Sequence, residues 1–136
     1  MKELTIAATV ENIGVVTDFV NEQLESFDCP MKAQMQIDIA IDELFGNIAH
    51  YAYNPEVGDA TVRVEVIEEP LSVTITFLDK GVPYDPLKNE DPDITLSADE
   101  REIGGLGIYM VKKSMDAVMY EYKDGQNILT IKKNLA

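Results

Sequence analysis

The sequence VRVEVIEEPLSVTITF at residues 62–77 establishes that the chain contains a β-sheet. Apolar and polar residues alternate on both sides of a short link at 68–70, which is the period of strands with one buried face. A link this short joins neighbouring strands that run in opposite directions. We therefore expect an antiparallel hairpin whose apolar face lies against a core.

Further strands are predicted at both ends of the chain. Apolar residues alternate with partly polar ones over residues 4–10, which indicates a first strand. Residues 118–122 and 127–132 flank Asp124-Gly125, a dipeptide that strongly favours a type I′ hairpin turn.

Three segments have helical periodicity. Residues 13–24 and 37–51 each place apolar side chains on one helical face, and Asp28-Cys29-Pro30 separates them. The second helix is predicted to end near Asn54-Pro55, and a third begins at Gly104. The expected buried positions are Ile13, Val16, Val20 and Leu24, then Ile37, Ile41, Leu44, Ile48 and Tyr51, then Ile108, Val111 and Met115. This order of elements predicts an α+β fold, a two-layer sandwich of one mixed β-sheet with the helices on one face.

Composition limits the classes of function. A chain of 136 residues that is 46% apolar is predicted to form one globular domain, residues 1–136. It has 11 Lys and Arg against 25 Asp and Glu, and the resulting charge of -14 disfavours nucleic acid and anionic membranes as partners. One cysteine, Cys29, excludes an internal disulfide and a cysteine-based zinc site. Without a long apolar stretch or signal peptide, a cytoplasmic location is expected.

Polar residues on the second helix form the first candidate site. Glu43, Asn47 and His50 stand at i, i+4 and i+7, so they share one helical face. A carboxylate and an amide one turn apart could place a base beside a metal or a phosphate. The same pattern also fits a polar stripe that faces water.

Two further candidates lie at the ends of predicted elements. Asp79 ends an apolar strand, where its carboxylate could accept a hydrogen bond from an exocyclic amine, and Gly81 would let a ligand approach the backbone. A plain turn gives the same pattern. The glycines at 104–107 open a helix whose exposed amides suit a polyphosphate, although a glycine-rich helix start needs no ligand.

The segment from Gly81 to Gly104 is predicted to be a long acidic loop. Its oxygen-bearing residues imitate the ligand positions of a calcium loop, but Leu96 stands where the sharp turn of that loop needs glycine. The imitating residues are Asp91, Asp93, Thr95, Ser97, Asp99 and Glu102. A solvated acidic lid is therefore the better interpretation than a calcium site.

Taken in order, three stretches resemble the nucleotide-binding boxes of the GHKL, or histidine-kinase-like, ATPase superfamily. They are DELFGN at 42–47, DKGVPYDP at 79–86 and GGLGI at 104–108. In particular, GGLGIYMVKKSMD at 104–116, followed by Val118 and Tyr120, resembles the anti-sigma-factor serine/threonine kinases of that superfamily. The resemblance spans nearly the whole chain and implies the ATP-binding fold of this group.

The resemblance implies a role for each matching residue. Asn47 would hold the Mg²⁺ that bridges the ATP phosphates, and Glu43 would be the general base. Asp79 would bind the adenine amino group, and Gly81 would give the base room. The remaining assignments are the phosphate-binding box Gly104, Gly105, Leu106, Gly107 and Ile108, an ATP lid at about 87–103, and Thr130 as support beneath the adenine.

The implied activity is that of an ATP- and Mg²⁺-dependent protein serine/threonine kinase acting as an anti-sigma regulatory factor. It would bind a sigma factor and phosphorylate a small antagonist protein. Members of the group commonly form homodimers, and the sequence leaves open whether this chain does. The family often has histidine four residues after the asparagine, whereas this chain has Tyr51 there, so His50 is given no role. The alternatives are a non-catalytic, nucleotide-dependent protein-binding module of the same fold and a structural protein without nucleotide.

Overall fold

The computed structural model describes residues 1–53, 55–87 and 105–135. Helices and strands follow the predicted order, with short 3-10 and π-helical turns, η1 and η2, added before α1 and after α2. The elements in chain order are β1 (Lys2–Ala7), η1 (Val10–Asn12), α1 (Ile13–Leu24), α2 (Met31–Asn47), η2 (Ile48–Ala52), β2 (Asp59–Ile67), β3 (Ser72–Asp79), α3 (Gly105–Ser114), β4 (Ala117–Lys123) and β5 (Gln126–Asn134).

The five strands form one sheet in the order β1-β2-β3-β5-β4. All four neighbouring pairs are antiparallel. The predicted α+β class is therefore confirmed, and the prediction that the sheet is mixed is wrong. The reason is the position of β5. The chain crosses from β3 through α3 to β4, which would give a parallel pair if the two strands were adjacent, but the hairpin places β5 between them.

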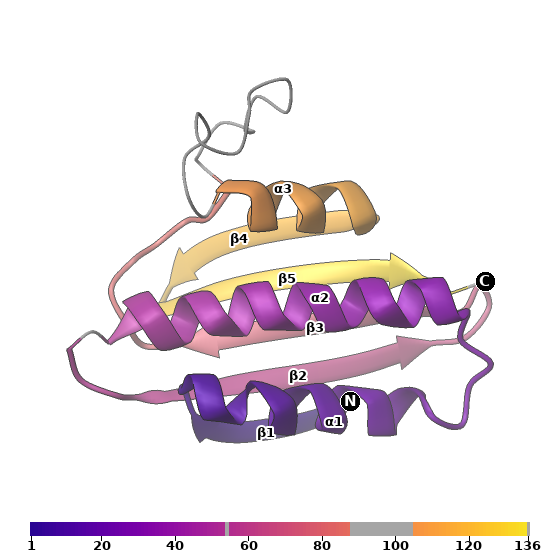
Figure 1. Ribbon diagram of the computed structural model, residues 1–136, viewed down its shortest axis with the longest axis horizontal. Helices are drawn as coiled ribbons and strands as arrows, with labels where there is room; N and C mark the ends of the chain where they lie inside the picture. The colour runs from indigo at the N-terminus through magenta and orange to yellow at the C-terminus, as the bar shows by residue number, and fades with distance from the viewer. Residues whose placement is uncertain (54, 88–104, 136) are drawn as a thin grey trace.

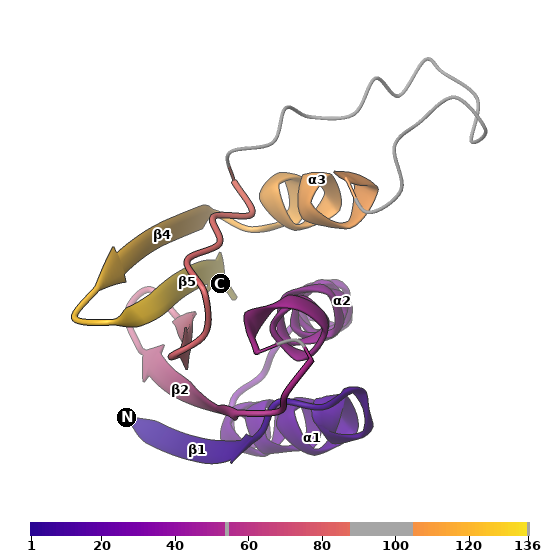
Figure 2. The ribbon, with the colours of Figure 1, turned by 90° about the vertical axis from the view of Figure 1, so that its left-hand side faces the viewer.

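All three helices lie on the same face of this sheet (Figure 1). Figure 2 shows the two layers edge-on, with α2 between α1 and α3. The alternating apolar residues of β2, β3 and β5 meet the helical stripes in one core, whose largest fully buried side chains include Phe45, Phe77 and Ile41. None of the helices in the described part of the chain is both long and apolar enough to cross a membrane.

One residue of the predicted first strand, Val10, and one predicted buried position, Tyr51, are exposed. Val10 lies in η1 instead of continuing β1, because the strand ends at Ala7. Tyr51 lies in η2, where the α-helix widens into a π-helical turn, so the α-helical stripe does not extend to it. The predicted hairpin turn is confirmed: Asp124 and Gly125 have φ values of 54° and 77°, as a type I′ turn requires.

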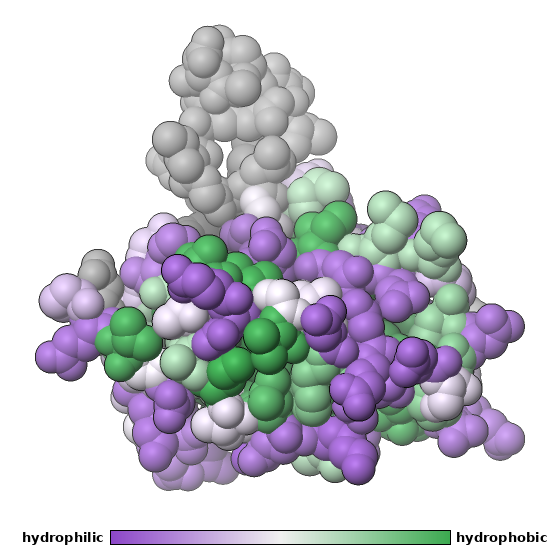
Figure 3. All heavy atoms as spheres, turned by 60° about the horizontal axis from the view of Figure 1, so that its bottom comes forward, coloured by the Kyte–Doolittle hydropathy of each residue, from purple (hydrophilic) through white to green (hydrophobic). Residues whose placement is uncertain are grey.

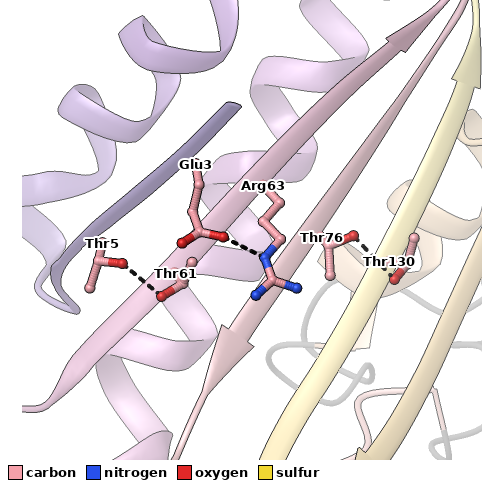
Figure 4. A network of polar contacts seen from close by, with 6 residues as sticks. All are labelled: Glu3, Thr5, Thr61, Arg63, Thr76 and Thr130. Carbon is pink, nitrogen blue, oxygen red and sulfur yellow. Dashed lines mark hydrogen bonds and ion pairs between the residues drawn. The ribbon is translucent and has the colours of Figure 1, made fainter. Parts of the chain in front are cut away.

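The other face of the sheet is free of helices and largely polar (Figure 4). Cross-strand pairs on this face join neighbouring strands. Arg63 Nε donates to Glu3 Oε2 at 2.6 Å. The remaining pairs are Thr5 with Thr61, whose hydroxyl oxygens lie 2.9 Å apart, and Thr76 with Thr130, at 3.5 Å. Such pairs let a half-open sheet face water on one side.

Candidate functional site

The C-terminal half of α2, the end of β3 and the start of α3 meet at one end of the molecule. The closest approach is between Gly107 on α3 and Glu43 on α2. A Cβ atom built on Gly107 would lie 2.2 Å from Glu43 Cδ, so only glycine fits there without displacing the carboxylate. The sequence thus brings the predicted base against the predicted phosphate box.

Asp79 is buried at the end of β3, with 5% of its surface exposed. Its Oδ1 atom accepts two hydrogen bonds of 2.9 Å, one from the Gly81 amide and one from Asn127 Nδ2. Burial raises the pKa of this carboxyl group, and these two bonds oppose the rise. Because both bonds go to Oδ1, the Oδ2 atom keeps its acceptor capacity for a ligand in the adjoining pocket.

Asn127 is a site residue that the sequence analysis missed. It pairs with Asp79 across β3 and β5 and is 6% exposed. Its Nδ2 atom donates to Asp79 and, at 2.9 Å, to the Val82 carbonyl oxygen. Its Oδ1 atom accepts from the Tyr84 amide at 3.1 Å and from the Tyr120 hydroxyl. Every donor and acceptor of the side-chain amide is therefore used.

A signal for Asn127 was present in the sequence. Residues 127, 129 and 131 alternate toward the core, and the first of them is a polar amide instead of an aliphatic side chain. A buried amide is expensive unless it is fully hydrogen-bonded, so its position alone indicates a partner such as Asp79.

A pocket opens beside Asp79 and Asn127 and reaches Asn47 on α2. Tyr51 and Tyr84 line its mouth, where their ring centroids lie 5.9 Å apart and their planes are inclined by 36°. Tyr120 lines another part of the wall. The apolar lining consists of Leu44, Ile48, Ala52, Phe77, Val82, Pro86 and Leu129. An apolar, aromatic pocket with a few polar groups at one end suits a flat heteroaromatic ring.

Glu43 and Asn47 lie one turn apart on the face of α2 that looks toward α3 and the pocket. Burial is the main cause that raises the pKa of Glu43, and the neighbouring Asp42 charge adds to it. A hydrogen bond from the Asn47 side chain lowers it again. Asn47 also lines the pocket, and its side-chain amide oxygen is of the kind that can bind a metal ion. A carboxylate with a raised pKa is a better proton acceptor near neutral pH.

Gly81 is needed for close packing. A Cβ atom at this position would lie 2.2 Å from the Ala52 carbonyl oxygen, and the next residue, Val82, donates its amide to that same oxygen at 2.9 Å. The glycine therefore fastens the segment after β3 to the end of η2. It shapes the wall of the pocket in this way, and its role in giving a bound base room stays a prediction.

Three candidate site residues, Thr130, Ile108 and His50, do not line the pocket. Thr130 is on the helix-free face of the sheet, opposite the pocket, because it alternates with the inward-facing Asn127 and Leu129 along β5 (Figure 4). The prediction that it supports a base is therefore wrong. Ile108 is buried in the core, and His50 is exposed in η2. Gly104, the lid predicted at about 87–103 apart from Leu87, and the calcium-like pattern at 91–102 lie outside the described residues.

The donor set fits magnesium better than a metal held by protein groups alone. Among the described residues, no group of three or more His, Cys, Asp or Glu side chains is placed to hold a metal ion. Mg²⁺ keeps several waters and is usually held by one or two protein oxygens together with substrate phosphates. The Asn47 amide oxygen, beside the Glu43 carboxylate, fits such a partial site.

Comparisons with known proteins agree with this geometry. Residues 6–133 match the family model of the histidine kinase-like ATPase domain. The chain is 27% identical over 105 residues to the serine/threonine-protein kinase BtrW of Bordetella bronchiseptica, which covers 77% of this chain and 73% of that protein. It is 30% identical over 134 residues to the serine-protein kinase RsbW of Bacillus mycoides, which covers 96% and 82%.

A solved structure has the same fold. The histidine kinase domain of the blue-light activated histidine kinase EL346 of Erythrobacter litoralis superposes with a TM-score of 0.54 at 13% sequence identity. The match covers 93% of this chain and 60% of that one. At this identity the likeness concerns the fold alone.

Proposed function

Because the chain belongs to the histidine kinase-like ATPase domain family, we propose that it is an ATP- and Mg²⁺-dependent protein serine/threonine kinase. The observation that carries the proposal is the position of Glu43 against Gly107 of α3, one helical turn from Asn47, which lines the pocket that contains Asp79. Binding a nucleotide requires Asp79 and the pocket, but it does not require a half-buried carboxylate with a raised pKa at the phosphate end. The kinase names of two relatives support the same choice.

Adenine would occupy the pocket between Asn47 and Asp79. The Oδ2 atom of Asp79 is an acceptor for the exocyclic amino group, and the aromatic rims of Tyr51 and Tyr84 lie where a ring would enter. Guanine presents a carbonyl oxygen at the place of that amino group, and two acceptors would then face each other. The proposal therefore includes a preference for ATP over GTP.

The phosphates would extend toward the start of α3. Amides in the first turn of a helix carry a partial positive charge and bind anions, and this helix begins at Gly105. Gly107 lets this turn lie against Glu43, so the base and the phosphate-binding amides are adjacent. A Mg²⁺ held by Asn47 would neutralise phosphate charge when bound.

Glu43 would accept the proton of a serine hydroxyl as that oxygen forms a bond to the γ-phosphorus. The bond from the γ-phosphorus to the bridging oxygen breaks in the same step, and ADP leaves. Phosphoryl transfer chiefly requires that the protein position the reactants and neutralise charge, and that one base hold the proton. The contact of Glu43 with Gly107 supports this role, because it places the carboxylate beside the first turn of α3.

The resemblance to anti-sigma-factor kinases supports a partner assignment as well. We propose that the chain acts in the cytoplasm, binds a sigma factor and phosphorylates a small antagonist protein, whose modification changes which partner is held. A homodimer belongs to the same proposal.

Replacement of Glu43 by Gln tests catalysis separately from nucleotide binding. Proteins that co-purify with the chain are incubated with it and labelled ATP, and phosphoserine is located by mass spectrometry. We expect phosphotransfer by Glu43→Gln to fall by about 10²–10⁴ with ATP affinity nearly unchanged. The matched control is Glu121→Gln on the exposed edge strand β4, which removes the same charge and should change neither quantity.

Measurements of phosphotransfer and of ATP binding also distinguish the proposed kinase from the alternative function. Normal phosphotransfer by Glu43→Gln would show that Glu43 is not the base. ATP binding without any phosphotransfer by the wild-type chain would favour a nucleotide-dependent binding module.

A further inference from the structure

The outer face of α2 carries an apolar stripe that no part of the described structure covers. Met31, Met35 and Ile39 are spaced at i, i+4 and i+8, so they lie along one side of the helix, away from the sheet. Their exposed fractions are 78%, 57% and 54%. Exposed apolar side chains in a row are more informative than the same residues scattered singly, because contiguous apolar patches mark interaction sites.

The stripe continues onto α3. Helices α2 and α3 run in opposite directions and touch at Glu43 and Gly107 (Figure 1). One turn from this contact along each helix lie Ile39 and Met110, and Met110 is 49% exposed. Three of the four apolar residues are methionines, whose flexible side chains adapt to different apolar surfaces.

An acidic groove adjoins the other side of the stripe. It lies between α1 and α2, and Gln34, which lines it, falls between Met31 and Met35 in the sequence. The carboxylates that line the groove are Asp18, Glu22, Glu25 and Asp28, and the described residues that line it include no lysine or arginine.

Polar contacts between the two helices fix the shape of this groove. Gln34 Nε2 donates to Asn21 Oδ1 at 3.1 Å, and Asn21 Nδ2 donates to Asp38 Oδ1 at 3.2 Å. Figure 3, which brings this side of the molecule forward, shows apolar patches surrounded by hydrophilic side chains.

We propose that Met31, Met35, Ile39 and Met110, together with the acidic groove, dock one amphipathic helix of a partner protein whose apolar side is flanked by lysine and arginine. The stripe provides a line of contacts for residues at i, i+3, i+4 and i+7 of a helix, which is how grooves recognise amphipathic helices. The groove selects for basic residues on one flank, since carboxylates that face like charges are repelled.

Charge also disfavours a second copy of this chain as the occupant of this surface. Each chain has a formal charge of -14, and the groove residues of a copy would be acidic too. The inference deepens the proposed function, because it names a surface by which a protein partner is held. It does not depend on catalysis, and its test requires no nucleotide.

The probe is a fluorescent 18-residue helical peptide with leucine on one face and lysine on the flanks, added to the intact chain. Its binding is followed by anisotropy, in parallel with a scrambled peptide of the same composition. We expect the amphipathic peptide to bind at least about tenfold more tightly than the scrambled one, and more weakly as salt rises.

Variants with matched controls locate the binding surface. The double variant Met35→Gln, Ile39→Gln should weaken peptide binding about tenfold. The control is Met119→Gln, which changes an equally exposed methionine on the helix-free face of the sheet and should change binding less than about twofold. Circular dichroism and urea unfolding confirm that each variant is folded.

A second pair of variants tests the acidic groove. Glu22→Gln, Glu25→Gln should weaken binding more than Glu65→Gln, Glu121→Gln, which removes the same charge from the opposite face of the sheet. Equal losses would mean general attraction to an acidic protein and would overturn the proposal, as would equal binding of the scrambled peptide. If the wild type dimerises in sedimentation experiments and Met35→Gln, Ile39→Gln does not, the stripe is instead an interface between copies.

Discussion

Asn127 lies at the base of the pocket, and its replacement by Asp should make the free energy of unfolding depend on pH. The substitution keeps the shape of the side chain and both bonds accepted by its Oδ1 atom, from the Tyr84 amide and the Tyr120 hydroxyl. It replaces the Nδ2 donor with an oxygen that faces two acceptors, Asp79 Oδ1 and the Val82 carbonyl, each 2.9 Å away in the wild type. Two buried bonds are lost, at about 1–3 kcal/mol each, so we expect the free energy of unfolding to fall by about 2–6 kcal/mol at neutral pH.

The sign of the pH effect follows from the new carboxylate pair. Two carboxylates in contact cannot both ionise, so one of them has a folded-state pKa above its unfolded value. Stability is then greatest when a proton bridges the pair at low pH, and it falls as pH rises through the raised pKa. Urea unfolding at about pH 5.5 and about pH 7.5 should show a deficit relative to wild type that is larger at the higher pH by about 1 kcal/mol or more.

The matched control is Gln126→Glu, which adds the same charge one residue away on the opposite face of β5. Its unfolding free energy should stay within about 0.5 kcal/mol of wild type. A deficit for Asn127→Asp that is equal at both pH values, or no larger than that of the control, would refute the assignment of Asn127 as the donor that holds Asp79.

Three further substitutions test the geometry of the site. Asp79→Asn should weaken ATP binding at least about tenfold, measured by calorimetry, because an amide cannot present the same acceptor to the adenine amine without turning. Gly107→Ala should leave the melting temperature nearly unchanged and reduce phosphotransfer, because its methyl group would push aside the flexible carboxylate of Glu43. Gly14→Ala, with open space around it, is the helical control and should stabilise the fold by about 0.4–1 kcal/mol in urea unfolding. Gly81→Ala places a methyl group 2.2 Å from a backbone oxygen that cannot move aside alone, so unfolding free energy should fall by about 1–3 kcal/mol.

Local periodicity was enough to predict the helices, the hairpins and most of the positions that the helices bury. The alternation around Ile75 and Phe77 and the stripe through Ile37 and Ile41 each report a backbone period directly. Strand order depends on long-range pairing, which no local pattern encodes, and for this reason the sheet was expected to be mixed. Tyr51 was misplaced for a related reason, since a π-helical turn changes the phase of a stripe.

Individual residues of the site were predictable to the extent that their chemistry is local. Glu43 and Asn47 share a helical face by spacing alone, and Asp79 marks the end of a strand. Thr130 was assigned to the site from the family resemblance, although alternation along β5 turns it away from the core face that Asn127 and Leu129 share. The register of β3 and β5 places Asn127 beside Asp79 and Thr130 beside Thr76, on the other face of the sheet.

The position of β5 also determines when the pocket can form during folding. β5 comes last in the order of synthesis among the five strands, yet it occupies an interior place in the sheet. The bond between Asn127 and Asp79 joins residues 48 positions apart, so a long loop must close before the base of the pocket exists. A nascent chain that has emerged only as far as α3 contains Glu43 and Asp79 but lacks β5, the strand that places Asn127 beside Asp79. Nucleotide binding would therefore report that the final strand has docked, and ATP would stabilise only chains whose folding is complete.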